Sequence, residues 1–163
     1  LASEPEWSQN RLRDLLAGEA LAPLQGQGWQ GGIAEGPLLV GNLTVATHLL
    51  GTKHCPDLAG RVLLLEDIGE APYRIDRLLT HWRLSGSLQQ LAGLGFGRFE
   101  GCEAPEDDAR PGFSLEQVLR ERSLDLGIPV VGELPFGHGQ PNAALPLGRT
   151  VRLDGSSGTL SVL

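Results

Sequence analysis

Four apolar residues in succession, Val62 to Leu65, form the strongest strand pattern in the chain. An apolar run of this length indicates a strand buried on both faces, as in the centre of a parallel or mixed sheet. We predict a strand over 61–65 that ends at Glu66, so that a carboxylate stands where a buried strand meets a turn. A carboxylate there is costly unless a partner satisfies it. From this stretch alone, a solvent-exposed glutamate in a turn explains the pattern equally well.

Helical periodicity follows directly after this turn. Pro72 is well placed to start a helix, and Ile75, Leu78, Leu79 and Trp82 show the i, i+3, i+4, i+7 spacing of one apolar face. Capping signals and apolar spacing predict further helices over 4–17 (Ser3 as N-cap of a capping box with Glu6), 42–50 (Asn42 as N-cap, Gly51 at the C′ position), 87–91 and 114–122 (a capping box after Phe113).

Shorter strand patterns lie between these helices. Strands are expected at 38–40, 91–96 and 128–131, and a terminal hairpin pairs 150–153 with 159–163. Short strands that alternate with four or five helices imply several βα steps. The predicted fold class is therefore α/β, with a mixed and partly barrel-like β-sheet, covering helices and a C-terminal β-hairpin.

The run from Gly26 to Gly31 fits the G-x-G-x-x-G pattern of dinucleotide-binding loops. Such a loop needs a strand before it and a helix after it. Here a proline-containing coil precedes the run and a strand pattern follows it. We interpret 23–32 as a loop and predict no nucleotide cofactor.

Composition and charge narrow the class of protein. The 163 residues suit one domain, and the net charge of −7 with a pI near 5.0 disfavours nucleic acid or an anionic membrane as the main partner. No run approaches the roughly 18 apolar residues of a membrane span, and we expect no signal peptide. The chain begins at Leu1 and contains no methionine. We expect a fragment or one domain of a longer protein, with processing of a short protein as the alternative.

Histidine and cysteine invite a metal hypothesis at His48, His54, Cys55 and Cys102. Their spacing matches no C-x-x-C or H-x-x-x-H pattern. Two cysteines also do not make a disulfide framework. We interpret these residues as ordinary loop or partly buried positions and predict no metal site.

His138 is the best catalytic candidate among the histidines, because Gly137 and Gly139 flank it. Flanking glycines allow positive φ and leave the imidazole accessible. An imidazole can accept and return a proton near neutral pH, and it needs an acceptor on its other ring nitrogen. Glu66 could be that acceptor. The sequence does not establish that the two meet, and a surface-loop histidine is the alternative.

No residue has the surroundings of an activated nucleophile. The pattern G-x-S-x-G is absent, and Gly155-Ser156-Ser157-Gly158 lies in the predicted hairpin loop. Neither cysteine has glycine-rich, strand-to-helix surroundings. The chain offers an acid and a base without the group that they would activate.

Three motifs, in this order, resemble the C-terminal domain of the LD-carboxypeptidases: Gly41-Asn42-Leu43, the run from Leu65-Glu66-Asp67 through Pro72-Tyr73-Arg74-Ile75-Asp76-Arg77, and Pro135-Phe136-Gly137-His138-Gly139 followed by Pro141-Asn142. These are serine peptidases that also include the microcin C7 self-immunity proteins. The resemblance covers nearly the whole chain, so 1–163 is expected to be this domain.

The resemblance implies a Ser-Glu-His triad that is split between two domains. The serine lies in an N-terminal, flavodoxin-like domain, which is missing here. By resemblance, Glu66 is the triad glutamate and His138 the general base, with Glu70 as the competing choice for the acid. Asn42 and Arg74 are expected to line the substrate side.

The resemblance also implies an activity. Family members remove the terminal D-alanine from murein tetrapeptides in cell-wall recycling, act in the cytoplasm, need no metal and are commonly homodimers. We expect this chain to be the C-terminal half of such an enzyme and inactive alone. The alternatives are a non-catalytic ligand-binding or interaction module, a serine supplied by a separate chain, and a microcin-type peptidyl-nucleotide amidase.

Overall fold

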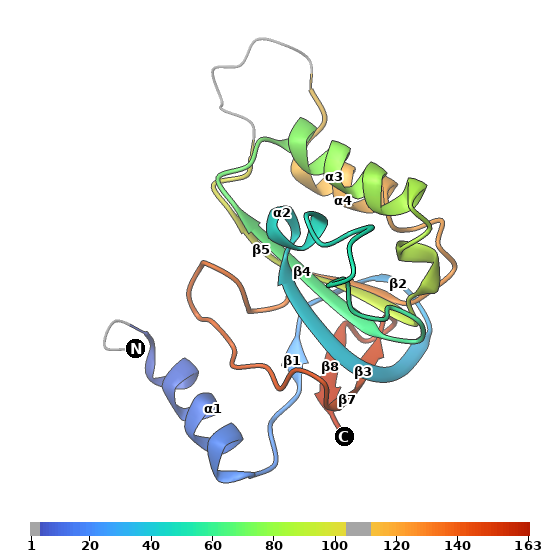
Figure 1. Cartoon of the computed structure of the whole chain (residues 1–163). Helices are drawn as coiled ribbons and strands as arrows, with labels where there is room; N and C mark the ends of the chain where they lie inside the picture. Colours follow the sequence, from blue (N-terminus) through green and yellow to red (C-terminus); the bar gives the residue numbers. More distant parts are fainter. Residues whose placement is uncertain (1–3, 104–111) are drawn as a thin grey trace.

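The computed structural model describes residues 4–103 and 112–163. In this part of the chain, helices surround one curved sheet (Figure 1). In chain order the elements are α1 (Glu6–Ala17), β1 (Leu24–Gln25), β2 (Gln27–Gln30), β3 (Ile33–Asn42), α2 (Leu43–Thr47), β4 (Val62–Ile68), α3 (Pro72–Leu84), the 3-10 helix η1 (Leu88–Gln90), β5 (Gly93–Glu100), α4 (Leu115–Glu121), β6 (Val130–Gly132), β7 (Thr150–Asp154) and β8 (Thr159–Val162).

The sheet is mixed and nearly closed. Its strand order is β1-β8-β7-β3-β4-β5-β6-β2, in which β3, β4, β5 and β6 run parallel and the other pairings are antiparallel. Strands β1 and β2 stand at opposite ends of this order, yet only Gly26 separates them in the chain. The two ends of the sheet therefore meet, and the predicted fold class is confirmed.

The glycine-rich segment 23–32, predicted to be a loop, instead forms β1 and β2 at this closure. A Cβ at Gly26 would lie 2.4 Å from the carbonyl oxygen of Gly132, and one at Gly28 would lie 2.3 Å from that of Gly155. These glycines let backbones approach closely where the barrel closes. The prediction was wrong because it treated the glycines as chain breakers.

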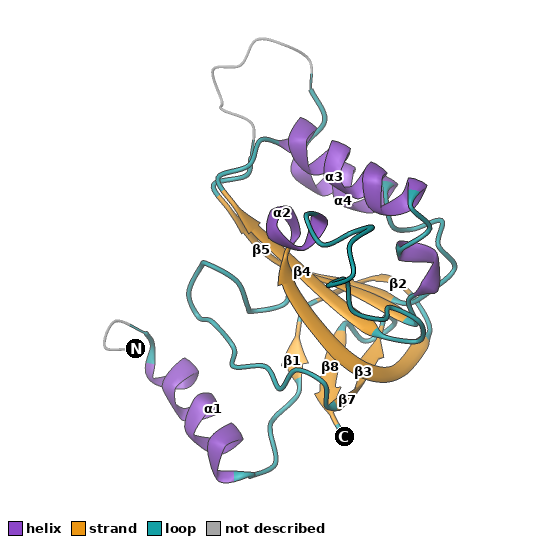
Figure 2. Ribbon diagram, in the orientation of Figure 1, coloured by secondary structure: helices purple, strands orange, loops and turns teal. Residues whose placement is uncertain are grey.

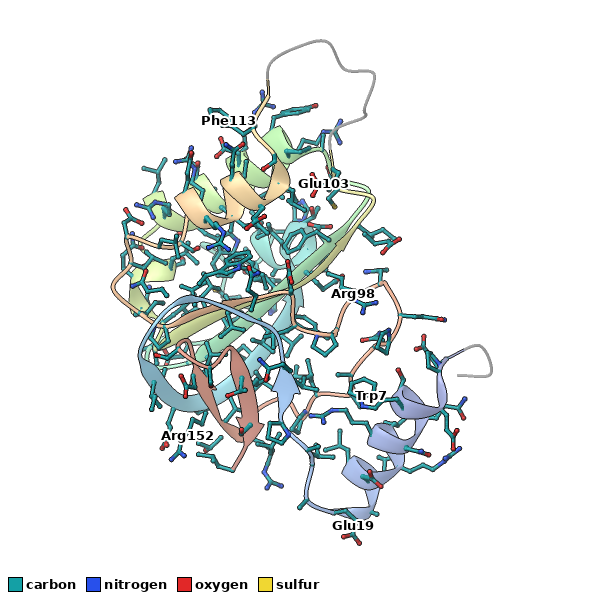
Figure 3. All side chains as sticks on the ribbon, turned by 180° about the vertical axis from the view of Figure 1, so that it is seen from behind. Trp7, Glu19, Arg98, Glu103, Phe113 and Arg152 are labelled. Atoms are coloured by element: carbon teal, nitrogen blue, oxygen red, sulfur yellow. The ribbon has the colours of Figure 1, made fainter. Side chains whose placement is uncertain are left out.

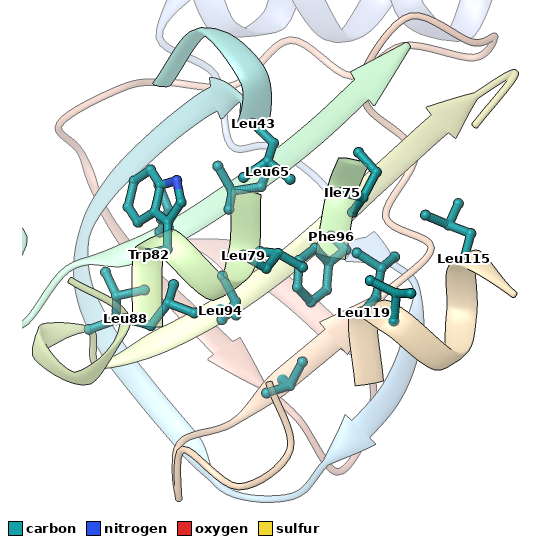
Figure 4. Close-up of a cluster of buried hydrophobic side chains, with 14 of the residues drawn as sticks. Leu43, Leu65, Ile75, Leu79, Trp82, Leu88, Leu94, Phe96, Leu115 and Leu119 are labelled. Atoms are coloured by element: carbon teal, nitrogen blue, oxygen red, sulfur yellow. The ribbon is translucent and has the colours of Figure 1, made fainter. Parts of the chain in front are cut away.

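Two apolar clusters form on the two faces of the sheet. One lies inside the barrel and joins residues of β1, β3, β4, β6, β7 and β8, among them Leu38, Leu64 and Leu153. The other lies between the sheet and α2, α3, α4 and η1 (Figure 4). The predicted apolar face of α3 takes part in it, because Ile75, Leu79 and Trp82 are buried. Burial of each large side chain contributes about 1.5–3 kcal/mol.

The capping signals at two helices are confirmed. Ser114 and Gln117 form a reciprocal capping box at α4, and the Asn42 side chain accepts the Val45 N–H at 3.0 Å at the start of α2. Helix α2 ends at Thr47 and is therefore shorter than the predicted helix over 42–50. Gly51 has φ +75° but lies in the turns beyond the helix end and not at C′.

The remaining helix boundaries differ in detail. Helix α1 begins at Glu6 after Pro5, and no side chain caps it. Ser3, the expected N-cap, lies outside the described residues. The predicted helix at 87–91 is the single 3-10 turn η1. In residues 4–103 and 112–163, no helix is long and apolar enough to cross a membrane.

Strands β3, β4 and β5 are longer than their apolar runs suggest, whereas β6, predicted at 128–131, covers only Val130–Gly132. Strand β4 continues to Ile68, so Glu66 lies inside the strand and not after it. Strand β5 likewise runs on to Glu100. Polar residues continue these strands because neighbours on both sides pair with them, including Asn42 opposite Glu66 and Phe99 opposite Asp67. The terminal hairpin β7–β8 is confirmed.

Candidate active site

Glu66 lies near the carboxyl end of β4, between the parallel strands β3 and β5. The pairing with β5 shifts beside it, from Leu65 opposite Phe96 to Asp67 opposite Phe99. Two residues of β5 therefore stand opposite Glu66 alone, which is a β-bulge. Only 7% of Glu66 is exposed. A carboxylate so deeply buried needs a hydrogen-bonding partner.

The long connection between β6 and β7, drawn in teal in Figure 2, brings His138 to this carboxylate. It first runs beside β5, where Leu134 N–H donates to Phe96 O at 3.0 Å and Arg98 N–H donates to Phe136 O at 2.9 Å. At Gly137 the backbone turns with φ +117°, and a Cβ there would lie 3.0 Å from Glu66 Oε2. A glycine is therefore required where the chain passes over Glu66.

His138 and Glu66 are in hydrogen-bond contact. His138 Nδ1 lies 2.7 Å from Glu66 Oε2, with the glutamate side chain 9% exposed and the imidazole 47% exposed. A carboxylate accepts a hydrogen bond from a protonated Nδ1, which leaves Nε2 of the neutral ring as a proton acceptor. A half-exposed imidazole held in this way can serve as an oriented general base.

A shallow groove of about 530 Å³ opens beside the pair. Asn42, Glu66 and His138 all line it, together with Val40, Gly41, Phe136, Gly137, Asn142, Ala143, Leu145 and Leu147. The Asn42 amide is already engaged, because it caps α2 and donates from Nδ2 to Asp67 Oδ1 at 2.9 Å. Asn42 can therefore present a fixed amide edge to the groove.

Glu70 and Arg74 pair with each other away from this groove. Arg74 Nη1 lies 3.3 Å from Glu70 Oε2, and Arg74 Nε donates to the Tyr73 hydroxyl at 3.1 Å. That hydrogen bond lowers the pKa of Tyr73. Of the two acidic candidates, Glu66 is the one brought to His138, and Arg74 is not among the lining residues. The substrate role of Arg74 stays a prediction.

Asp67 is a polar residue that the sequence reasoning did not single out. It is 2% exposed, and it accepts hydrogen bonds from Asn42 Nδ2, Thr44 N–H, Thr44 Oγ1 and Ile68 N–H at 2.8–2.9 Å. It thereby ties the first turn of α2 to β4 beside the candidate pair. The signal that could have found Asp67 is the doublet Glu66-Asp67. Neighbouring side chains in a strand point to opposite faces of the sheet, so each of two buried acids needs a hydrogen-bonding partner of its own.

A nucleophile is not found among the groove-lining residues of the described chain, which include neither serine nor cysteine. Burial raises the pKa of the Cys102 thiol, which disfavours the reactive thiolate, and its sulfur accepts the Glu70 N–H at 3.4 Å. Ser156 and Ser157 lie in the β7–β8 turn, where Asp154 accepts their N–H groups. Within the described ranges, no three metal-ligating side chains come together.

Comparison with known proteins gives consistent results. A sequence model described as the LD-carboxypeptidase C-terminal domain matches residues 35–153. A protein of Synechocystis sp. with a carboxypeptidase name is 55% identical over 163 residues, which is 100% of this chain and 54% of that protein. The murein tetrapeptide carboxypeptidase of Pseudomonas aeruginosa is 36% identical over 166 residues, covering 94% of this chain and 52% of the enzyme.

A solved structure agrees with these sequence relatives. The crystal structure of the muramoyltetrapeptide carboxypeptidase from Oxalobacter formigenes matches with a TM-score of 0.84 and 30% identity, covering 98% of this chain and 55% of that one. The chain spans about half the length of the curated relatives it matches.

Proposed function

This chain belongs to the LD-carboxypeptidase family, and we propose that it supplies the Glu and His of a Ser-Glu-His triad. In this proposal the assembled enzyme removes the terminal D-alanine from murein tetrapeptides in cell-wall recycling. The observation that carries the proposal is the 2.7 Å contact between Glu66 and His138 at the edge of an open groove. The names of the murein carboxypeptidase relatives support the substrate class.

The chemistry follows from the geometry of the pair. His138 Nε2 takes the proton of a serine hydroxyl while the serine oxygen bonds to the carbonyl carbon of the scissile amide. The imidazolium then gives this proton to the departing amine of D-alanine as the C–N bond breaks. A water molecule, deprotonated by the same nitrogen, then bonds to the acyl carbon, and the imidazolium returns this proton to the serine oxygen as the ester bond breaks and the shortened peptide leaves. Glu66 stays ionised throughout and stabilises the imidazolium.

The serine, in this proposal, comes from an N-terminal nucleophile domain outside this chain. The groove that His138 faces has no hydroxyl or thiol among its lining residues in the described chain. A second domain placed over the groove would complete the triad, with Asn42 on the substrate side. Without it the chain would be inactive, because loss of one triad member removes most of the acceleration. We further propose a cytoplasmic homodimer that uses no cofactor.

Release of D-alanine from a murein tetrapeptide tests this function. The chain is assayed alone and fused to the half of the Synechocystis relative that it does not match, with the intact relative as positive control. We expect the fusion to be active, the chain alone to be inert, and His138→Gln to abolish the activity of the fusion. Activity of the chain alone, or a folded fusion that leaves the tetrapeptide intact beside an active control, would contradict the proposal.

The same assay separates the alternatives. A non-catalytic module would stay inert in the fusion, and a peptidyl-nucleotide amidase would cleave an aminoacyl sulfamoyl nucleoside in preference to the tetrapeptide. A serine supplied by a separate chain would restore activity when the two halves are mixed without a covalent link.

A further inference from the structure

The turn that carries His138 has glycines on both sides of the histidine, Gly137 and Gly139. Glycine has more accessible backbone conformations than any other residue. Local contacts must therefore fix the direction of the imidazole. The bond to Glu66 holds one atom of the ring and does not act on the backbone groups of the turn.

A short loop closes beneath the histidine. Asn142 Oδ1 accepts the N–H of Gly137 at 3.2 Å, and Ala143 N–H donates to Pro135 O at 2.8 Å. The first of these bonds acts on the backbone N–H of Gly137, the residue directly before His138. Because an N–H group can only donate, the atom of Asn142 that faces it must be the carbonyl oxygen of the amide. One specific side chain thus favours one backbone conformation at Gly137.

Asn142 is itself held in place by helix α1. Ser8 Oγ accepts the N–H of Asn142 at 2.9 Å, and Arg11 donates from Nε to Ala144 O at 3.2 Å and from Nη1 to Ala22 O at 2.7 Å. Ser8 and Arg11 are the buried residues of this helix, at 5% and 6% exposure. One turn apart, they face the same direction.

The buried stripe of α1 is therefore polar and matched to the backbone of the loop. Figures 1 and 3 show α1 beside the segment between β6 and β7 and apart from α3 and α4, with Trp7 of α1 labelled near that segment. A helix that packs through hydrogen bonds onto a loop fixes the position of that loop more than it extends the apolar core. Burial also lowers the pKa of the Arg11 guanidinium, and the two carbonyl oxygens compensate for its lost hydration.

We propose that Asn142, anchored by Ser8 of helix α1, is a positioning residue that holds the Gly137–His138 turn so that the imidazole meets Glu66. Asn142 lines the groove, and its positioning role acts through the N–H of Gly137. The first helix of the chain thereby becomes part of the apparatus that orients the general base. The significance of this role for catalysis rests on the proposed function, whereas the role itself concerns the geometry of this chain.

Nuclear magnetic resonance of the isotope-labelled chain tests the positioning role without any assay of activity. The probe is the Nδ1 proton of His138, identified by its loss in His138→Gln, and the measurement is its rate of exchange with water. We expect Asn142→Ala to raise this rate by about tenfold, as for the loss of one hydrogen bond. Asn142→Asp keeps an acceptor oxygen and should stay within about threefold of the original rate, since the N–H of Gly137 keeps its partner.

Two further variants make the test specific. Asn10→Ala, on the exposed side of the same helix, should leave the rate unchanged. Ser8→Ala keeps Asn142 but removes its anchor, and should raise the rate by a smaller factor than Asn142→Ala. If Asn142→Ala does not fold, Ser8→Ala decides the question. Exchange at the original rate in both Asn142→Ala and Ser8→Ala would overturn the proposal.

Activity of the fused enzyme is the second readout. Asn142→Ala should lower kcat by about tenfold or more with KM nearly unchanged, because a misplaced base slows the chemical step. Asn142→Asp should restore most of kcat. If the unmutated fusion has no activity, the proposed function fails, and the exchange rates still decide whether Asn142 positions His138. A kcat that is unchanged in Asn142→Ala would overturn the catalytic significance.

Discussion

Glu66 and Asp67 are neighbours in strand β4, and their carboxylates bind elements on opposite faces of the sheet. Glu66 meets His138 at 2.7 Å, whereas Asp67 accepts from Asn42 and Thr44 at the start of α2. Side chains of successive strand residues point to opposite faces, so one doublet can serve two purposes. Glu66 faces a groove and an exposed imidazole, and Asp67 is enclosed by hydrogen-bond donors. Variants at Glu66 should therefore lose activity, whereas variants at Asp67 should lose stability.

Glu66→Gln should lower the kcat of the fused enzyme by about 10³–10⁴-fold, because an amide can donate to Nδ1 and favour the wrong imidazole tautomer. The matched variant is Glu70→Gln. Glu70 pairs with Arg74, whose side chain is 58% exposed, and a pair this exposed contributes about 1 kcal/mol or less. D-alanine release should hardly change in Glu70→Gln. The opposite ranking would make Glu70 the acid of the triad.

Asp67→Asn should destabilise the chain without acting on His138. The variant replaces one acceptor oxygen with a donor among four donated hydrogen bonds, and a buried group left unsatisfied costs about 1–3 kcal/mol. Urea unfolding at neutral pH measures this loss, with Glu19→Gln in the exposed segment after α1 as control. Unfolding curves that coincide for Asp67→Asn and the unmutated chain would show that this network contributes little.

The parts of the fold that the sequence predicted well are those with local causes. The apolar face of α3, the capping box at Ser114 and the run from Val62 to Leu65 are each set by spacing within a few residues. Periodicity and capping describe such causes directly. The terminal hairpin belongs to the same class, because its two strands are neighbours in the chain.

The parts that the sequence left open depend on contacts between distant segments. Gly26, between β1 and β2, and Gly28, in β2, lie against the backbone of Gly132 and Gly155, more than 100 residues away, and no local pattern contains that information. The pairing of Glu66 with His138 spans 72 positions. The residue types suggested it, and the family resemblance implied it. Gly137 was expected to allow a positive φ, but its passage over Glu66 and the bulge in β5, which bring the two groups together, could not be read from the sequence.

Asp154 should make the stability of the chain depend on pH in acid. Hydrogen bonds from the backbone N–H groups of Ser157 and Ser156 hold its pKa below the ordinary value of 3.8. A pKa that is lower in the folded chain than in the unfolded chain stabilises the fold above the unfolded value, and this contribution is lost as the pH falls through the folded value.

Asp154→Ala should accordingly lower the denaturation midpoint at neutral pH, and the difference from the unmutated chain should shrink as the pH falls below about 4. Chemical denaturation at a series of pH values measures it. Asp154→Asn keeps an acceptor for the turn but cannot titrate, so its midpoint should lack this acid-dependent loss. Parallel midpoint curves for Asp154→Ala and the unmutated chain would refute the assignment.

Gly137→Ala tests whether the turn over Glu66 requires a glycine. The new Cβ would lie 3.0 Å from both Glu66 Oε2 and Arg98 O, at a backbone φ of +117°. Gly86→Ala is the matched control, because Gly86 also has positive φ but has no heavy atom within 4 Å of its Cβ position. Strain alone should cost the control about 1–2 kcal/mol.

Gly137→Ala should cost more in urea unfolding than Gly86→Ala, and it should also lower the kcat of the fused enzyme, since the turn must move away from Glu66. The control should keep its kcat while losing some stability. Equal effects of the two variants on kcat would mean that the close approach of the turn to Glu66 does not matter for the chemistry. A loss of kcat confined to Gly137→Ala would instead tie the orientation of His138 to the absence of a side chain at that residue.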